Sequence, residues 1–154
     1  MSETVLEIKK GRGCVLLCLS DGETLRVPAS LYRERKVREG ETIEPMLYKA
    51  FILQRGPSHA MDAAVRLLSV ADRTEKELRE RLEGVGYPEV VVEGVLQKLV
   101  DLNLVNDARY AEVWTRSRAH RQGRQRLRQE LTRRGVSRED TEEALSVITD
   151  EEQL

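Results

Sequence analysis

The sequence feature that most constrains the fold is an internal repeat. When the sequence is aligned with itself at a shift of 49 positions, identical residues match without a gap: Leu78 with Leu127, Leu82 with Leu131, and Gly86 with Gly135. Leucines four residues apart lie on one face of a helix, and glycine is common where a helix ends. The repeat therefore predicts two copies of a small helical unit. Because a unit of this size buries little apolar surface by itself, we expect neighbouring copies to share a core.

Capping signals divide each copy into three helices. Thr74 and Glu77 have the spacing of a capping box, in which a hydroxyl and a glutamate satisfy backbone amides at a helix start. Ser137 begins a second, weaker box, and Gly86 and Gly135 occupy positions expected for left-handed helix caps. We therefore expect helices at about 58–70, 74–84 and 88–101 in the first copy, and at about 107–120, 123–134 and 138–149 in the second.

The first part of the chain follows a different pattern. Alternating and continuous apolar runs predict strands at about 4–9, 13–19 and 23–27. Asp21-Gly22 is a hairpin signal between the last two of these strands. Cys14 and Cys18 lie on one strand, where a rise of about 3.3 Å per residue separates them too far for a disulfide. We therefore expect two free thiols.

The pattern between this β-rich segment and the repeats is mixed. We expect a short helix at about 30–36 and a second helix that begins at Pro45, and we expect Gly56-Pro57 to end that second helix. The predicted fold class is α+β, mainly α, with tandem three-helix repeats preceded by a small β-rich N-terminal domain. The predicted boundaries are 1–56 for the β-rich domain, 57–105 and 106–150 for the repeats, and 151–154 for an acidic tail.

Composition excludes several functional classes. The 26 basic and 27 acidic residues give a net charge of −1, which is unlike a basic nucleic-acid tail or an acidic disordered segment. No run approaches the roughly 18 apolar residues of a membrane helix, and the acidic, polar N-terminus is unlike a secretory signal. We therefore expect a cytoplasmic protein that has no membrane partner.

No group of residues has the spacing of an active site. The two histidines, His59 and His120, are far apart and have no neighbouring cysteine or histidine at metal-ligand spacing. The sequence contains no phosphate-binding glycine loop that ends in Gly-Lys-Ser/Thr, and no nucleophile elbow. We therefore expect no catalytic residue, metal, cofactor or small-molecule substrate, and we expect a chain that is not an enzyme.

Charge is unevenly distributed within the second repeat. Eight arginines and a single acid, Glu130, lie between positions 116 and 134, whereas every charged residue after Arg138 is acidic. Arginine presents a fixed fork of donors that suits phosphates and carboxylates. We interpret seven of these arginines as a surface for phosphate or acidic protein: Arg116, Arg118, Arg121, Arg124, Arg126, Arg128 and Arg133. The alternative is a solvated helix face.

The two aromatic residues of this repeat are spaced for one helix face. Tyr110 and Trp114 are four residues apart. We interpret Trp114 as a core anchor. The alternative is a platform on which nucleic-acid bases stack.

Three motifs, in this order, resemble those of the RecX family of regulatory proteins. They are Leu67-Leu68-Ser69 with Arg73-Thr74-Glu75-Lys76-Glu77-Leu78, then Asn106-Asp107-Ala108-Arg109-Tyr110-Ala111, then Gly123-Arg124-Gln125-Arg126-Leu127-Arg128-Gln129-Glu130-Leu131 with Gly135-Val136. The resemblance covers about 58–150, and 1–56 is similar to the β-rich extension of some members. It marks a set of mostly structural residues: Thr74, Glu77, Leu78, Leu82, Asp107, Tyr110, Ala111, Gly123, Leu127, Leu131 and Gly135.

The resemblance implies a modulator of the RecA recombinase. Family members bind RecA and its filament on single-stranded DNA, suppress ATP hydrolysis and strand exchange, and in some cases bind single- or double-stranded DNA directly. These roles belong to DNA repair, homologous recombination and the SOS response. Members commonly carry three repeats, of which we expect two in this sequence. The alternative is an independent DNA-binding regulator built from homeodomain-like three-helix units.

Overall fold

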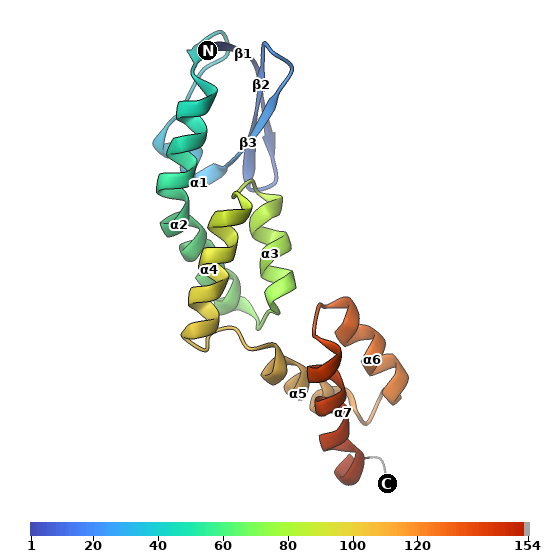
Figure 1. Cartoon of the computed structure of the whole chain (residues 1–154). Coiled ribbons are helices and arrows are strands. Elements are labelled where there is room, and N and C mark those ends of the chain that lie inside the picture. Colours follow the sequence, from blue (N-terminus) through green and yellow to red (C-terminus); the bar gives the residue numbers. More distant parts are fainter. Residues whose placement is uncertain (153–154) are drawn as a thin grey trace. The chain divides into compact units, whose positions relative to one another are not determined.

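The computed structural model describes the backbone of residues 1–152 and the side chains of residues 1–146 (Figure 1). Its elements follow in chain order: β1 (Glu3–Gly11), β2 (Cys14–Leu19), β3 (Thr24–Pro28), α1 (Ala29–Glu34), β4 (Thr42–Ile43), α2 (Pro45–Val70), α3 (Glu75–Gly84), α4 (Glu89–Asp101), α5 (Asp107–Arg118), α6 (Arg124–Arg133) and α7 (Arg138–Glu152). Helices predominate beside one small antiparallel sheet, which confirms the predicted fold class. The predicted acidic tail at 151–154 lies outside the residues whose side chains are described.

The chain forms two compact units, which are described separately. The first contains residues 1–65 and 80–95, and the second contains residues 66–79 and 96–154. Helices α2, α3 and α4 therefore contribute residues to both units. Among the described residues, no helix combines the length and the hydropathy of a bilayer-spanning segment.

The first unit contains an antiparallel sheet in the order β3-β2-β1-β4. The turn between β2 and β3 lies at Asp21-Gly22, where Gly22 has a φ of +91° and donates its N–H to Leu19 O at 3.0 Å, which confirms the predicted hairpin. Cys14 and Cys18 are free thiols on β2. Strand β4 spans only Thr42–Ile43, too short for an alternating pattern, so the sequence does not predict it.

One face of the sheet and helices α1 and α2 supply the core of the first unit. Val15, Leu17 and Leu19 are buried along β2, and they alternate with half-buried residues as a strand with one core-facing side requires. Leu31 of α1 and Tyr48 of α2 are also buried. The short helix α1 is thus held by its apolar residue rather than by its length.

Helix α2 continues through Gly56-Pro57, so the predicted helix end at this dipeptide is wrong. Proline in a helix interior removes a hydrogen bond and costs about 3 kcal/mol. This cost is offset because the buried row of α2 continues past the proline: Pro45, Tyr48, Ile52, Gly56, Ala60 and Ala64. Gly56 packs beside α4, where a Cβ at this position would lie 3.5 Å from Val91, at ordinary van der Waals contact.

A polar network joins α1 to α2. Arg55 donates two hydrogen bonds to the carboxylate of Glu34, at 3.0 and 3.1 Å, and His59 Nε2 lies 2.8 Å from the same carboxylate. His59 Nδ1 lies 2.9 Å from Ser30 Oγ. The hydrogen bonds from Arg55 and His59 lower the pKa of Glu34 to about 2. The network therefore holds a carboxylate that stays ionised far into the acid range.

Helix ends in the second unit follow the capping signals. Thr74 Oγ1 accepts a hydrogen bond from Glu77 N–H at 3.2 Å, and Glu77 Oε1 accepts one from Thr74 N–H at 3.1 Å, which confirms the capping box. Ser137 Oγ accepts from Asp140 N–H at 3.1 Å at the start of α7. Gly135 has a φ of +93°, which confirms the left-handed cap after α6. These local bonds explain why the helix bounds agree closely with the predicted ones.

Candidate interaction surface

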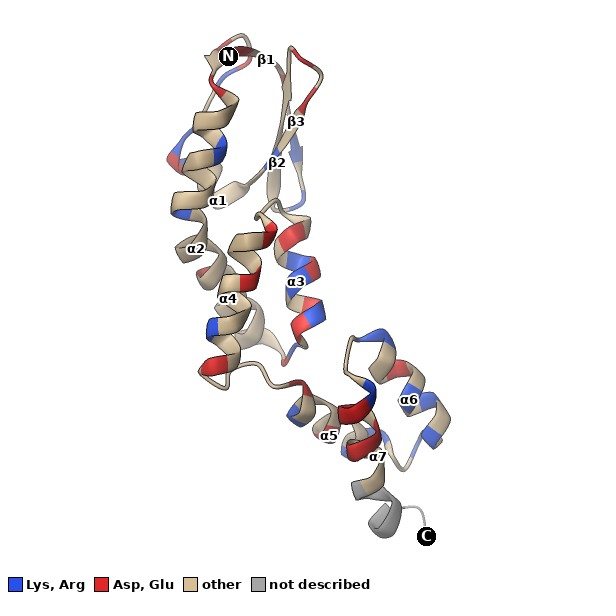
Figure 2. Cartoon of the chain, in the orientation of Figure 1, with Lys and Arg blue, Asp and Glu red and all other residues tan. Residues whose placement is uncertain are grey.

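Helices α5, α6 and α7 form the scaffold that carries the candidate arginines. Two clusters of buried side chains hold them together: Ala111, Leu131, Val136 and Ala144 in one, and Ala119, Leu127 and Leu145 in the other. Trp114 packs against both clusters, which supports its interpretation as a core anchor. Because the leucines hold one face of α6 against this core, the remaining positions of α6 carry its basic residues (Figure 2).

The aliphatic residues in the set that the resemblance marks as mostly structural are all buried. They are Leu78, Leu82, Ala111, Leu127 and Leu131. Their exposed fractions do not exceed 1%. The leucines matched by the internal repeat therefore occupy core positions, as the helical spacing predicts.

Trp114 lies among aromatic and cationic groups. The Tyr110 ring stacks with it at a centroid separation of 5.9 Å. The guanidinium carbons of Arg118 and Arg134 lie 3.3 and 3.9 Å from the centroid of the indole ring. Such cation–π contacts are favourable, more so where water is excluded. Arg118, one of the seven candidates, is therefore engaged within the repeat.

Arg128 is held by an acid on the neighbouring helix. Its guanidinium donates to both carboxylate oxygens of Glu142 on α7, at 2.9 to 3.1 Å. It also donates to Gln125 Oε1 at 2.7 Å. The hydrogen bonds between the two side chains raise the pKa of Arg128 and lower the pKa of Glu142. A two-bond arginine–carboxylate contact of this kind fixes geometry as well as charge.

Arg116 and Arg133 pair with acids on their own helices. Arg116 Nη2 lies 3.1 Å from Glu112 Oε1, and Arg133 Nη2 lies 2.5 Å from Glu130 Oε2. Both arginine side chains are more than half exposed, at 53% and 71%. Exposed pairs along one helix contribute little to stability. These arginines can exchange their carboxylates for groups on a partner at small cost.

Arg121, Arg124 and Arg126 surround the start of α6. Arg121 and Arg126 are exposed, and neither guanidinium has a hydrogen bond or an ion pair with any described residue. Arg124 is half-buried and donates to Leu145 O at 3.4 Å. Gly123, the N-cap residue, offers no side-chain acceptor, and the first turn contains no acid. The start of α6 is therefore strongly positive, because the arginines lie at the positive end of the helix dipole.

Residues of the first and second motifs meet at Arg134. Thr74 Oγ1 donates to the backbone carbonyl of Arg134 at 2.6 Å. The Arg134 guanidinium lies 3.3 Å from Glu77 and donates to the Tyr110 hydroxyl at 3.2 Å. Residue spacing does not reveal the role of Arg134, because its partners are 57 and 24 residues away. The one available signal is that the shift of 49 places this charge on the apolar Val85.

A second set of contacts joins the start of α3 to the start of α5 and to the turn that follows α6. The Asp107 carboxylate accepts a hydrogen bond from Glu75 N–H at 3.0 Å, and burial raises the pKa of Asp107. Lys76 Nζ donates to Arg133 O at 3.2 Å. A Cβ at Gly135 would collide with the Lys76 side chain. These contacts hold the start of α3 against the second repeat.

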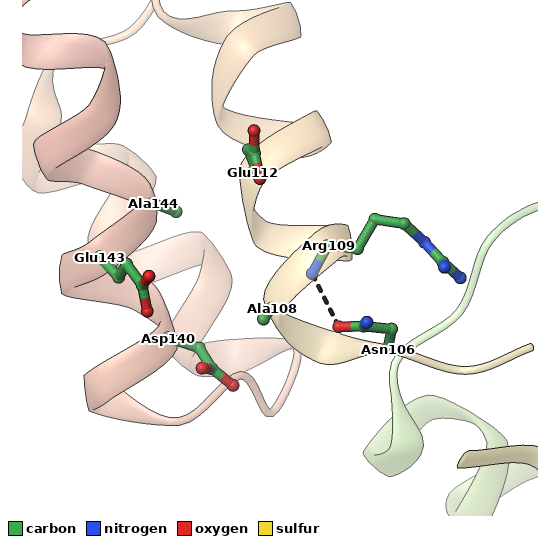
Figure 3. A pocket seen from close by; sticks show the side chains of 7 residues that line it. All are labelled: Asn106, Ala108, Arg109, Glu112, Asp140, Glu143 and Ala144. Atoms are coloured by element: carbon green, nitrogen blue, oxygen red, sulfur yellow. Dashed lines mark hydrogen bonds between the residues drawn. The ribbon is translucent and has the colours of Figure 1, made fainter. Parts of the chain in front are cut away.

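A pocket of about 250 Å³ lies between α5 and α7 (Figure 3). Three carboxylates line it, from Glu112, Asp140 and Glu143, whereas the guanidinium of Arg109, the basic residue of the lining, points away from them and donates to Asn103 O at 3.3 Å (Figure 3). Phosphate groups would be repelled by these acids. The pocket is therefore distinct in charge from the start of α6, and the arginine surface does not extend into it.

These observations define a class of protein: a tandem three-helix-repeat protein whose second repeat is rich in arginine. Comparison with protein families gives the same repeats. The model of the RecX first three-helix domain matches residues 60–99, and the model of the RecX second three-helix domain matches residues 106–145. The chain belongs to the RecX family of regulatory proteins.

Individual relatives agree with this assignment. The regulatory protein RecX of Levilactobacillus brevis is 31% identical over 98% of the chain, which spans 58% of that relative. The crystal structure of RecX from Lactobacillus salivarius is 31% identical and matches with a TM-score of 0.59, over 61% of this chain and 62% of that one. A crystal structure of a regulatory protein RecX is 25% identical and matches with a TM-score of 0.60, over 96% and 74%.

Proposed function

We propose that this chain is a non-catalytic regulator of the RecA recombinase. It binds RecA and the RecA filament on single-stranded DNA, and it lowers the ATPase and strand-exchange activities of that filament. The observation that carries the proposal is the match of both three-helix domains to RecX, in order. The relatives are themselves named regulatory proteins.

The charge pattern of the second repeat is consistent with such a partner. A filament of protein and DNA presents phosphates and carboxylates together, and arginine binds both. The side chains of Arg121 and Arg126 are exposed and have no partner among the described residues, so they are free to meet these groups. The other five candidates contact groups within the repeat. We therefore assign the first contact to Arg121 and Arg126.

The proposal is tested by DNA-dependent ATP hydrolysis of purified RecA. We expect the chain to inhibit hydrolysis on single-stranded DNA. The variant Arg121→Glu/Arg126→Glu is expected to inhibit less, with little change in folding, because exposed substitutions usually change stability by about 0.5 kcal/mol or less. Arg33→Glu/Lys36→Glu, which makes the same charge change at exposed residues of the first unit, serves as the matched control.

Two outcomes separate the parts of the proposal. No inhibition at a several-fold molar excess over RecA contradicts regulation of RecA. Inhibition by the Arg121→Glu/Arg126→Glu variant that equals that of the unaltered chain contradicts only the assigned surface, and would leave these arginines as a solvated face.

The second candidate function is DNA binding without RecA. It is favoured by the positive start of α6, where the arginines and the helix dipole act together. Gel shifts on duplex DNA at rising salt test it, because each phosphate contact adds to the salt dependence of affinity. Undetectable binding to duplex at low salt rules this candidate out.

The proposed partner also sets the cellular setting. RecA acts on chromosomal DNA, so the proposed location is the cytoplasm, and the proposed processes are homologous recombination, DNA repair and the SOS response. Imaging of a tagged chain before and after DNA damage is the direct test. A distribution that never overlaps the nucleoid contradicts the setting.

A further inference from the structure

Strand β1 has an open backbone edge near its C-terminal end. It pairs with β2 as far as Gly11, but β4 covers only Glu3 and Thr4 on the other side. The next residue whose backbone groups face away from β2 is Val5. Its N–H donates to Glu41 O at 2.8 Å and its carbonyl accepts from Gly40 N–H at 2.7 Å, both in the turn before β4. Beyond this point no strand accompanies β1 on that side among the described residues.

A carboxylate occupies the place of a missing strand. Ile8 N–H donates to Glu39 Oε1 at 3.0 Å, in the direction in which a neighbouring strand would offer a carbonyl. Alternate residues of a strand direct their backbone groups to the same side, so Lys10 presents its N–H and carbonyl at the same edge. Neither group of Lys10 has a partner on that side in the described part of the chain.

Basic side chains surround this edge. Lys9, Lys10 and Arg12 are all exposed, and Lys10 and Arg12 have no ion pair with any described residue. Lys9 Nζ lies 3.9 Å from a carboxylate oxygen of the exposed Glu7. Consecutive residues of a strand point to opposite faces, so positive charge flanks the edge on both faces of the sheet. The coloured ribbon shows basic residues at the end of the sheet where β1 turns into β2 (Figure 2).

We infer that the edge of β1 at residues 8–11 binds an extended acidic segment of a partner polypeptide by strand addition. The backbone of the segment pairs with Lys10 and displaces the Glu39 carboxylate from Ile8, and its acidic side chains meet Lys9, Lys10 and Arg12. The inference is independent of the proposed regulation of RecA, because it concerns only the first unit.

The chemistry of the edge favours a peptide over other partners. A strand edge offers donors and acceptors in alternation, whereas a phosphate backbone offers only acceptors. A second copy of this chain would bring Lys9, Lys10 and Arg12 against their own equivalents, and such like-charge pairs are destabilising. The competing interpretation is that the lysines merely protect an exposed edge from unwanted pairing. That interpretation predicts no binding.

The test uses the isotope-labelled full chain and three acetylated, amidated heptapeptides, followed by backbone amide resonances. The first peptide alternates short runs of Glu and Asp with Val. The second has the same sequence with alternate backbone amides methylated, so that it keeps the charge but cannot pair as a strand. The third has Lys in place of the acids. We expect only the first to shift the amides of residues 8–11 and to slow hydrogen exchange at Lys10.

Variants of the chain are expected to weaken, to leave unchanged or to strengthen binding of the acidic peptide. Lys10→Glu/Arg12→Glu converts two attractions into repulsions and is expected to weaken binding of the acidic peptide about tenfold. Arg33→Glu/Lys36→Glu, with the same charge change elsewhere in the unit, is expected to bind as the unaltered chain does. Glu39→Ala frees Ile8 N–H and is expected to bind the peptide more tightly. This gain cannot arise from damage to the fold.

Three results overturn the inference. The first is that millimolar acidic peptide shifts none of the amides of residues 8–11. The second is that the methylated peptide binds as tightly as the unmethylated one, and the third is that single-stranded oligothymidylate binds the same amides more tightly and displaces the acidic peptide. The RecA ATPase assay has no bearing on any of them, so failure here is distinguishable from failure of the proposed function.

Discussion

The starts of α3 and α6 occupy equivalent positions in the two repeats and are built from opposite charges. The shift of 49 places Thr74 on Gly123 and Glu77 on Arg126. At α3, hydroxyl and carboxylate form a reciprocal capping box. At α6, the N-cap has no side-chain acceptor and the first turn has no acid. The buried leucines that follow are nevertheless the same in both copies.

This difference shows that the leucines and the polar residues of a repeat have separate tasks. The leucines determine that a three-helix unit forms, because they fill its core. The polar residues at the helix start are free to change. Arginine at a helix N-terminus opposes the dipole and costs about 0.3–1 kcal/mol. The second repeat therefore gives up local stability for positive charge at its surface, which agrees with the proposed polyanionic partner.

The largest expected effect tests the shared part of the comparison. Leu127→Ala in the second repeat and Leu78→Ala, its equivalent in the first, should each lower the free energy of unfolding by about 2–5 kcal/mol, because both side chains are 0% exposed. Denaturant unfolding measures this. The control is Val90→Ala at an exposed site, which should change the free energy of unfolding little. A Leu127→Ala variant as stable as the unaltered chain would refute the core assignment.

A smaller effect is expected at the two cap glycines. Gly86 and Gly135 both have positive φ, at +114° and +93°. A Cβ at Gly86 would collide with the Arg26 carbonyl oxygen at 2.5 Å, and one at Gly135 would collide with the Lys76 side chain close to its own Cβ. Gly86→Ala and Gly135→Ala should therefore each lower the free energy of unfolding by about 1–3 kcal/mol. Thermal unfolding in which either variant is as stable as the unaltered chain contradicts this prediction.

Exchange of the two helix starts tests the part that differs. Gly123→Thr/Arg126→Glu places the α3 capping box on α6, where Gly123 has a φ of −70° and open space around a Cβ. The change should raise the free energy of unfolding by about 1 kcal/mol and weaken inhibition of RecA. Gly123→Thr alone is the control, since it keeps Arg126. Higher stability with undiminished inhibition would show that Arg126 is not part of the interface with RecA.

The smallest effect concerns the arginine that is already paired. Arg128 lowers the pKa of Glu142 below its usual 4.5, so the unfolded chain binds this proton first as the pH falls. The pair therefore stabilises the fold above pH 4.5, and this contribution is lost as the pH falls through the lowered pKa. Unfolding followed across this range should show a weaker pH dependence for Glu142→Gln than for the control Glu139→Gln. Identical slopes would contradict the pairing.

Sequence periodicity predicts the elements that depend on neighbouring residues. The capping box at Thr74, the cap at Gly135 and the buried leucines all follow from spacings of three or four residues, and the structure confirms them. The predicted break at Pro57 is wrong because a long-range effect prevails: burial along α2 outweighs the local preference of proline. Local signals do not report how much a distant surface stabilises a helix.

The candidate surface is less predictable for the same reason. Spacing alone places Arg124 and Arg128 in one row, but it does not reveal that Arg128 binds Glu142, 14 residues away, or that Arg118 lies over Trp114. Tertiary contacts decide which arginines are engaged and which remain available. The role of the seven candidate arginines in binding stays a prediction.

The position of Trp114 has a practical consequence for spectroscopy. It is the one tryptophan of the chain, and it lies in the second repeat between packed helices and two guanidinium groups. Its fluorescence therefore reports on that repeat alone, whereas circular dichroism reports on every helix. If the two signals change at the same denaturant concentration, the units unfold as one cooperative body. If they separate, the chain is a pair of independently melting parts, and Trp114 identifies which part melts first.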